Sequence, residues 1–405
     1  MNLIRDLEEL QGQGAIIQTV QTRKLTIDGH THLYPVFKVR LDLLFYNDQN
    51  DRIATWISHY KSEHNGNVPD RSDREAYNRI IEEFIVSSNP ESIRKTQANI
   101  EMVDQREAGV VLADGRIIDG NRRFTCLRRL AEKNDRFKYF ETVILERKIE
   151  TNAKQIKMLE LSIQHGEESK VDYNPVDRLV GVYNDIVLTS LLSVEEYAKS
   201  SNESESDVKK SIEISKLMVE FLQFINAPEQ FYIARDLELC FPLEELLKLF
   251  RKCKTKDEIE DLKSIAFANI LMQTSSDMGR YIRNMKLVLG TDYQEEFFEE
   301  QMALAAKVID ELPAPGKVNL ATIREKVRAN EERRQELKRS MDKALVKTRR
   351  DETKNKPILL AEKAVACLES MDLNILQKMN SSERLRLVEQ LDKLGYVANQ
   401  IKEKL

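Results

Sequence analysis

The segment Ala113–Leu130 reads ADGRIIDGNRRFTCLRRL, and its pattern decides how the N-terminal part of the chain folds. Two short apolar runs flank Asp114-Gly115, a dipeptide that favours a tight turn between antiparallel strands. After Gly120 the apolar residues recur at helical spacing and fall on one face. The segment therefore predicts a hairpin whose second strand leads through a glycine into a helix.

The start of this predicted helix has chemistry that suits an anion. Backbone N–H groups at a helix N-terminus favour negative charge, and Gly120 allows a ligand to approach the backbone closely. Arg122 and Arg123 add two guanidinium groups that match phosphate oxygens. The alternative from the residues alone is a pair of solvated first-turn arginines, with Asp119 as a simple helix cap. Both interpretations stay open at this point.

The remainder of the first 150 residues mixes strand and helix patterns. Apolar, β-branched and aromatic residues are dense from Gln18 to Phe45, with Asp28-Gly29 as a turn, and this predicts a hairpin. A polar loop follows at 46–52, and Thr142–Leu145 is a further strand. Beyond about Asn152 the pattern is helical almost to the end. We expect an α+β N-terminal domain followed by mostly α-helical domains.

A helix-turn-helix is predicted at about 193–216. Ser193 suits the N-cap of the first helix, and Asn202 suits a turn residue with positive φ. Ala198 is small enough for the contact between two closely packed helices. Val208 is the expected core residue of the second helix.

The residues of this motif that would contact double-stranded DNA are Ser204, Ser206, Lys209 and Lys210. Phosphate contacts made by Lys and Arg dominate the affinity of most DNA-binding proteins. Residues 193–216 nevertheless carry four basic and six acidic side chains, for a net charge of 4 − 6 = −2. The alternative is a helical pair that serves only as a packing module.

The chain becomes basic at 317–357, where 14 Lys and Arg stand against 7 Asp and Glu, for a net charge of 14 − 7 = +7. Such a run is typical of a solvated helix or coiled-coil face. It also suits a non-specific contact to DNA phosphates. No aromatic residue interleaves with the cations, which argues against stacking on single strands.

A predicted helix near the C-terminus has one apolar stripe. Because such a stripe must be buried somewhere, it predicts a homodimer. The stripe consists of Leu385, Val388, Leu391, Leu394 and Val397.

Composition narrows the class of protein. The chain of 405 residues has 63 Lys and Arg against 68 Asp and Glu, so any DNA contact needs a local patch. Its four cysteines show no CxxC spacing, which argues against a zinc site or a disulfide framework. No run of 18 apolar residues and no signal peptide is present, so no membrane association is expected. We expect a cytoplasmic protein.

Three motifs in order resemble the ParB/sulfiredoxin-like superfamily. Residues 39–52, VRLDLLFYNDQNDR, are similar to the strand and Asn-rich loop that open the ParB N-terminal domain. Residues 114–123, DGRIIDGNRR, resemble its Gly-x-Arg-Arg box. Residues 172–178, DYNPVDR, resemble the Asn-Pro junction that leads into the ParB helix-turn-helix. The resemblance covers roughly residues 15–225.

The resemblance implies a ParB-like N-terminal domain that binds a nucleoside triphosphate, CTP or ATP, with Mg²⁺ as a candidate companion ion. Together with the Pro-rich linker at 312–316 and the basic run that follows it, the resemblance predicts three domains. They are 1–166 for nucleotide binding, 167–312 for a helical domain with the helix-turn-helix, and 317–405 for a basic, amphipathic C-terminal region. The implied nucleotide-binding residues are Asn47, Asn50, Arg52, Gly120, Asn121, Arg122, Arg123, Thr125 and Gln164.

The chain departs from partition ParB proteins at two places. Asn121 stands where their box has Glu. Their acidic-Asn-x-Gln-Arg segment, which serves the metal and hydrolysis, has its nearest match at Leu161–His165, where only Gln164 agrees. The sequence therefore assigns no metal ligands and leaves hydrolysis open. The nearest acidic residues are Glu160, Glu167 and Glu168.

Three functions are compatible with these features. The first is a ParB-like DNA-binding protein in which the nucleotide acts as a conformational switch. The second is an enzyme of the same fold, a nuclease or an NTP-hydrolysing or phosphotransfer protein in DNA modification or phage defence. Asp119 would then be catalytic, as a metal ligand or base beside Arg122 and Arg123. The third is a binding scaffold without nucleotide chemistry.

Overall fold

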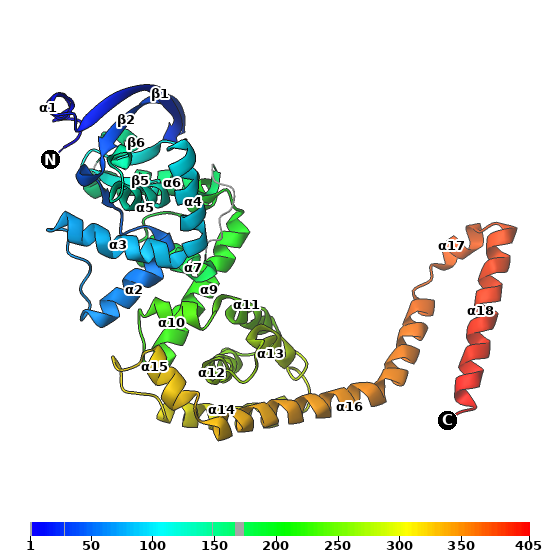
Figure 1. Cartoon of the computed structure of the whole chain (residues 1–405). Helices are drawn as coiled ribbons and strands as arrows, with labels where there is room; N and C mark the ends of the chain where they lie inside the picture. The colour runs from blue at the N-terminus through cyan, green and yellow to red at the C-terminus, as the bar shows by residue number, and fades with distance from the viewer. Residues whose placement is uncertain (1, 28, 148, 167–173) are drawn as a thin grey trace. The chain divides into compact units, whose positions relative to one another are not determined.

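The computed structural model describes residues 2–27, 29–147, 149–166 and 174–405. The chain divides into two compact units, Met1–Met341 and Asp342–Leu405. An N-terminal part that mixes strands and helices is followed by a mostly helical part, as the sequence predicts (Figure 1). No helix in the described ranges is both long enough and apolar enough to cross a membrane.

One mixed six-stranded sheet organises the N-terminal part. Its strands lie in the order β1-β2-β6-β4-β5-β3, with β4 parallel to β6 and β3 parallel to β5, and the other neighbours antiparallel. The predicted hairpin around Asp114-Gly115 is confirmed as the β4–β5 pair. In the other predicted hairpin, Asp28 lies outside the described residues, and Ile27 pairs with His30. The strands are β1 Ile16–Ile27, β2 His30–Arg40, β3 Phe45–Tyr46, β4 Gly109–Leu112, β5 Arg116–Asp119 and β6 Tyr139–Leu145.

Each face of this sheet has its own apolar core, because successive side chains of a strand point to opposite faces. Val111 packs with side chains of α3, α4 and α5 in one core, whereas Val110 packs with side chains of α6 in the other. The sheet is therefore covered by helices on both faces. The helices of this part are α1 Leu7–Gly12, α2 Ala54–Glu63, α3 Arg74–Ser88, α4 Pro90–Val103, α5 Asn121–Ala131 and α6 Ile149–Gly166.

The rest of the chain is helical. Its elements are α7 Pro175–Val182, α8 Val194–Ser201, α9 Glu205–Phe224, α10 Phe231–Asp236, α11 Cys240–Leu249, α12 Lys256–Met272, α13 Met278–Met285, α14 Gln294–Asp310, α15 Leu320–Thr322, α16 Glu331–Glu369, α17 Leu373–Lys378 and α18 Ser381–Lys402. Short helical turns occur along the whole chain at η1 Leu41–Leu43, η2 Asp51–Ile53, η3 Asp135–Phe137, η4 Tyr183–Leu188, η5 Phe250–Lys252 and η6 Ile323–Val327.

The α8–α9 pair has the local features that the sequence predicts. Ser193 caps α8 in a capping box, and Asn202 forms the turn with a φ of +55°. Val208 of α9 is fully buried. It shares a core with Leu161 of α6, so side chains from both sides of residues 167–173 pack together in this core.

Unit 2 contains most of α16 together with α17 and α18. The N-cap of α18 is Asn380, one residue before the Ser-Ser pair that opens the helix. All five side chains of the predicted dimer stripe on α18 are exposed. The homodimer therefore stays a prediction.

Gly120 joins β5 to α5 in a backbone conformation that few other residues adopt. Its φ is +98°, in the left-handed region. A Cβ atom at this position would lie 2.7 Å from Cζ of Phe140 and 3.4 Å from the Cα of Gly109. The fold itself thus requires glycine here, independently of any ligand.

We expect Gly120→Ala to lower the free energy of unfolding by about 2–5 kcal/mol. The left-handed φ costs an L-residue about 1–2 kcal/mol, and overpacking against Phe140 adds about 1–3 kcal/mol. Urea unfolding followed by far-UV circular dichroism measures the change. Gly12→Ala is the matched control, because a Cβ there meets nothing within 4 Å. Equal stability of the two variants would contradict this account of Gly120.

Candidate functional site

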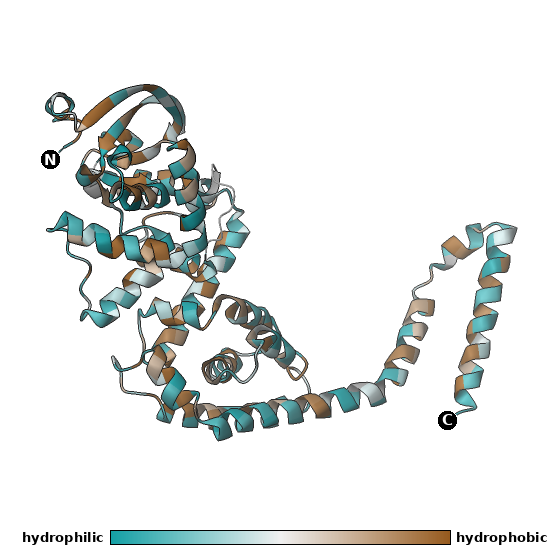
Figure 2. Cartoon of the chain, in the orientation of Figure 1, coloured by the Kyte–Doolittle hydropathy of each residue, from teal (hydrophilic) through white to brown (hydrophobic). Residues whose placement is uncertain are grey.

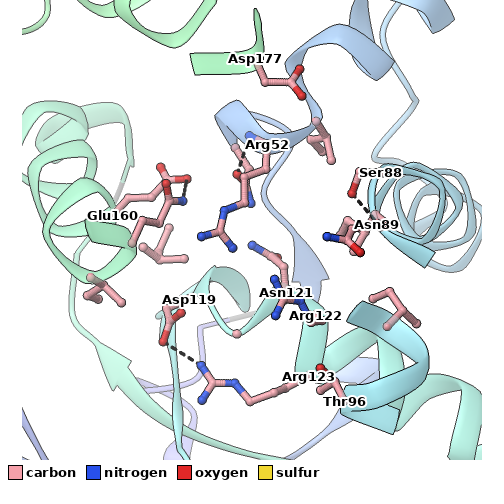
Figure 3. Close-up of a pocket in the computed structure, with 18 of the residues that line it drawn as sticks. Arg52, Ser88, Asn89, Thr96, Asp119, Asn121, Arg122, Arg123, Glu160 and Asp177 are labelled. Carbon is pink, nitrogen blue, oxygen red and sulfur yellow. Dashed lines mark hydrogen bonds and ion pairs between the residues drawn. The ribbon is translucent and has the colours of Figure 1, made fainter. Parts of the chain in front are cut away.

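A pocket of about 550 Å³ opens where the start of α5 faces η2, α6, the α3–α4 junction and the start of α7 (Figure 3). Its lining comes from segments that are far apart in the sequence, so only the fold brings them together. Most of the predicted nucleotide-binding residues lie in its wall, as does Asp119. These are Asn50, Arg52, Gly120, Asn121, Arg122, Arg123 and Gln164.

Two predicted residues, Asn47 and Thr125, do not line this pocket. Asn47 is 2% exposed, accepts a hydrogen bond from the backbone N–H of Gln49 and lines a second pocket. Thr125 is fully buried, and its hydroxyl donates to the backbone carbonyl of Asn121 over 2.9 Å. Thr125 also lies within hydrogen-bond distance of the Tyr46 hydroxyl, at 2.8 Å. Both residues support the loop and helix that form the wall.

The two arginines of the Gly-Asn-Arg-Arg segment have different surroundings. Arg123 donates to the carboxylate of Glu107 over 3.0 Å and to Asp119 over 3.1 Å, so neighbouring carboxylates hold its guanidinium. Arg122 instead extends toward the middle of the pocket, where Arg52 and Asn121 also point (Figure 3). The guanidinium groups of Arg52 and Arg122 therefore meet beside the N-terminus of α5, where backbone N–H groups favour an anion.

Asp119 has a clear structural partner set. Its Oδ2 atom accepts from Arg23 over 2.8 Å and from Arg123 over 3.1 Å. A carboxylate oxygen that already accepts from two guanidinium groups is poorly placed to bind a metal. The geometry assigns Asp119 the role of positioning Arg123, and its catalytic role stays a prediction.

Two amide oxygens in the pocket wall have no hydrogen-bond partner among the described residues. The amide nitrogen of Gln164 donates to Glu160 over 3.2 Å, which leaves Oε1 of Gln164 as a buried acceptor. Oδ1 of Asn121 is a second buried acceptor without a donor. Because leaving such atoms unsatisfied costs about 1–3 kcal/mol each, they favour a ligand or water that supplies donors.

The α3–α4 junction contributes pocket residues that the sequence analysis missed. Ser88, Asn89 and Thr96 line the side that faces Glu160 (Figure 3). Asn89 also caps α4 by accepting from the backbone N–H of Ser92. The Asn-Pro pair at 89–90 signals the start of a helix, but no local signal links it to a ligand.

The start of α7 closes the pocket with Asn174, Pro175 and Asp177. Asp177 accepts from the backbone N–H of Thr55 over 3.1 Å, which fixes α7 to the start of α2. Asp172 and Tyr173 of the predicted junction lie outside the described residues, as do Glu167 and Glu168.

A buried ion cluster lies behind the pocket. The ammonium of Lys157 is 2.8 Å from Asp51, 3.5 Å from Asp185 and 3.9 Å from Glu160. Gly181 provides space for it, since a Cβ there would lie 2.6 Å from the carboxyl carbon of Asp51. Glu160 belongs both to this cluster and to the pocket wall.

Burial changes the acidity of these groups. It raises the pKa of Glu160 and of Asp185 to about 7, against the attraction of Lys157. Burial also raises the pKa of Asp177 to about 6. Burial opposes the charge of Lys157, but the three carboxylates outweigh it and keep the pKa of Lys157 well above its usual value. No group of three or more His, Cys, Asp or Glu side chains in the described ranges is arranged to hold a metal ion.

The four predicted DNA-contacting residues each have an intramolecular neighbour. The hydroxyl of Ser204 caps α9 through the backbone N–H of Asp207 and lies 2.8 Å from the hydroxyl of Ser206. Lys209 pairs with Glu205 over 3.0 Å, and Lys210 pairs with Glu244 of α11 over 2.7 Å. These pairs reduce the positive charge that α9 can offer to phosphates.

Comparison with known proteins assigns no family: no protein-family model matches the chain, and no curated protein matches it. The chain is a protein with a mixed sheet covered by helices on both faces, an arginine-bearing pocket at a helix N-terminus, and a long helical C-terminal part.

We expect the ion cluster to make stability depend on pH. The folded-state pKa of Glu160, about 7, exceeds its ordinary 4.5, so between these values the folded chain binds more protons than the unfolded chain. The free energy of unfolding should therefore fall as pH rises from 5 to 8. In Glu160→Gln this fall should be smaller by about 1–3 kcal/mol.

Urea unfolding of both proteins at pH 5 and pH 8 measures the difference. Glu83→Gln, which changes an exposed residue of α3, is the matched control and should behave like wild type. An identical pH dependence of Glu160→Gln and wild type would show that Glu160 does not titrate in this range.

Proposed function

We propose that this chain is a ParB-like protein that binds a nucleoside triphosphate, CTP or ATP, at the start of α5 and contacts double-stranded DNA. One observation carries the nucleotide part of the proposal. Arg52, Arg122 and the N-terminus of α5 converge with Gln164 on one pocket of about 550 Å³. This volume lies within the range of about 300–1,000 Å³ that is usual for small-molecule sites.

The chemistry of the wall suits a ligand with two different ends. The two guanidinium groups and the helix N-terminus favour phosphate oxygens. The unpartnered amide oxygens of Asn121 and Gln164 repel phosphate but accept hydrogen bonds from amino or hydroxyl groups. A nucleotide supplies both kinds of group, whereas inorganic phosphate supplies only one.

The position of the pocket supports a switch. Its wall combines η2 and α5 of the sheet-containing part with the start of α7, which opens the helical part. A ligand that contacts all three binds best when they are close together. Its binding energy would therefore shift the protein toward that arrangement.

Double-stranded DNA and a second copy of the chain are the partners in this proposal, in a cytoplasmic, nucleoid-associated protein. The α8–α9 pair has the capped, tightly turned form that a helix-turn-helix needs. The basic residues of 317–357 and the exposed stripe on α18 support DNA contact and self-association, respectively.

A hydrolytic enzyme is the second candidate, because Glu160 lines the pocket and burial raises its pKa to about 7. A carboxylate with a pKa near the working pH suits a general base. If this candidate is correct, wild type should release phosphate from CTP or ATP with Mg²⁺, and Glu160→Gln should be slower by about 100-fold or more. An equal rate in both proteins would exclude Glu160 as the base.

We expect isothermal titration calorimetry to detect CTP or ATP binding to the full chain. Arg122→Ala and Arg52→Ala should each weaken it by about 10–100-fold, since a hydrogen bond to a charged group contributes about 1.5–3 kcal/mol. Arg129→Ala is the matched control, because Arg129 lies on α5 but not in the pocket wall. Unchanged affinity in both pocket variants, or no nucleotide binding at all, would remove the proposed site.

A further inference from the structure

Most of the Lys and Arg residues of the basic region 317–357 lie on the long helix α16. From 338 to 356 it has eight Lys and Arg against three Asp and Glu, for a net charge of 8 − 3 = +5, although the whole chain is at −5. Hydrophilic residues predominate along the N-terminal part of α16 (Figure 2). From this arrangement we infer that the outer face of α16 binds the phosphate backbone of duplex DNA. The inference rests on the DNA part of the proposed function.

The exposed cations of 338–356 lie mainly on one side of α16, with the exposed carboxylate of Asp342 among them. At about 100° per residue, Lys338, Arg349 and Lys356 point within about 20° of one another. Arg339, Arg350 and Lys354 point about 100–160° away, so together they cover about half of the circumference. All six side chains are exposed.

The opposite side of α16 is apolar at its start. Leu337 is fully buried and Met341 is 1% exposed, and both point roughly opposite the centre of the cationic face. The start of α16 is thus buried on that side, and the cations at 338 and 339 lie on its exposed side.

The length of this face suits a duplex. With a rise of about 1.5 Å per residue, Lys338 and Lys356 are about 27 Å apart along the helix. Duplex DNA carries about one negative charge per 1.7 Å of its axis, so a face of this length spans several phosphates of one strand.

Other partners fit this face less well. A helix that lies on a membrane needs an apolar face with large aromatic or aliphatic side chains beside its cations. Among the described side chains of 338–356, only Val346 is large, apolar and exposed, and no aromatic residue is present, so this requirement is poorly met. The lack of aromatic residues also argues against base stacking on single strands. The second helix of the α8–α9 pair is a weaker candidate for duplex affinity, because Lys209 and Lys210 are paired with carboxylates.

The start of α16 is excluded from this surface. Arg333 is paired with Glu311 over 3.2 Å and also contacts Glu336, while Arg334 contacts Glu331. Arg333 ties the start of α16 to Glu311, whereas the contact of Arg334 with Glu331 lies within the helix. The test therefore leaves them intact.

The test variant replaces four exposed cations of the inferred face with Gln, which keeps helix propensity: Lys338→Gln, Arg339→Gln, Arg349→Gln and Arg350→Gln. Fluorescence anisotropy with a random-sequence duplex, at several salt concentrations, gives affinity and its salt dependence for the full chain. Each lost phosphate contact removes about 0.9 from the slope of log affinity against log salt. We expect the slope to flatten by about 3–4, with affinity reduced about tenfold or more at low salt.

The matched control removes the same charge from exposed residues near the C-terminus, three on α18 and one just after it: Arg386→Gln, Lys393→Gln, Lys402→Gln and Lys404→Gln. It should bind duplex with a slope close to that of wild type. The double variant Lys209→Ala with Lys210→Ala, measured in the same way, gives the contribution of α9 to duplex affinity for comparison with that of α16. Unchanged far-UV circular dichroism shows that each variant is folded.

The outcomes separate the inference from the proposed function. If wild type binds no duplex at low salt, with or without CTP or ATP, the DNA partner itself is wrong. If wild type binds and the α16 variant binds equally well, the inferred surface is wrong while the DNA partner stands. An equal loss in the α18 control would show an effect of net charge and would overturn the inference. Binding to anionic phospholipid vesicles but not to duplex would also overturn it.

Discussion

The buried ammonium of Lys157 is the constraint on which the arrangement around the pocket depends. A charged group out of contact with water is expensive unless carboxylates compensate for it, and here Asp51, Glu160 and Asp185 do so. These partners come from η2, α6 and η4, so one cation ties together segments that are more than 100 residues apart. The backbone of Arg52 is fixed as a result, because it follows Asp51 directly.

The same cluster explains why the pocket has two chemical sides. Glu160 faces the cluster and also holds the amide of Gln164, which leaves an acceptor oxygen in the wall. Across the pocket, Asp119 and Glu107 are ion-paired with Arg123, whereas Arg122 extends toward the middle of the pocket. Adjacent arginines of similar intrinsic chemistry are thus given different roles by their neighbours.

Charge along the chain is distributed unevenly. The predicted DNA-reading pair is acidic overall, and its lysines have carboxylate partners, whereas exposed cations accumulate on one face of α16. This separation favours a protein in which the α8–α9 pair sets the orientation on DNA and α16 supplies the electrostatic affinity. The net charge of −5 conceals this arrangement, because it averages over both regions.

The sequence by itself determined the local elements. Several local features depend on residues within a few positions of one another. They are the β4–β5 hairpin, the left-handed backbone conformation of Asn202, and the helix N-caps Ser193 and Ser204. Such signals are legible without the fold, because turn and cap preferences arise from the backbone and its nearest side chains. The grouping of Arg52, Gly120 and Gln164 was expected only through a resemblance to a family.

The tertiary structure alone decided which of these residues meet and what each one contacts. Lys157 forms an ion pair with Asp51, and Arg123 forms one with Asp119. Ser88 and Thr96 line the pocket together with residues from distant segments. Gly120 shows the difference most directly. The sequence marks it as a break between strand and helix, but only packing shows that the ring of Phe140 leaves no space for a side chain there. Turn and cap preferences act over a few bonds, whereas burial and ion pairing act through space. The sequence therefore specifies the local helices, strands and turns. Only the packed chain specifies which side chains form the pocket.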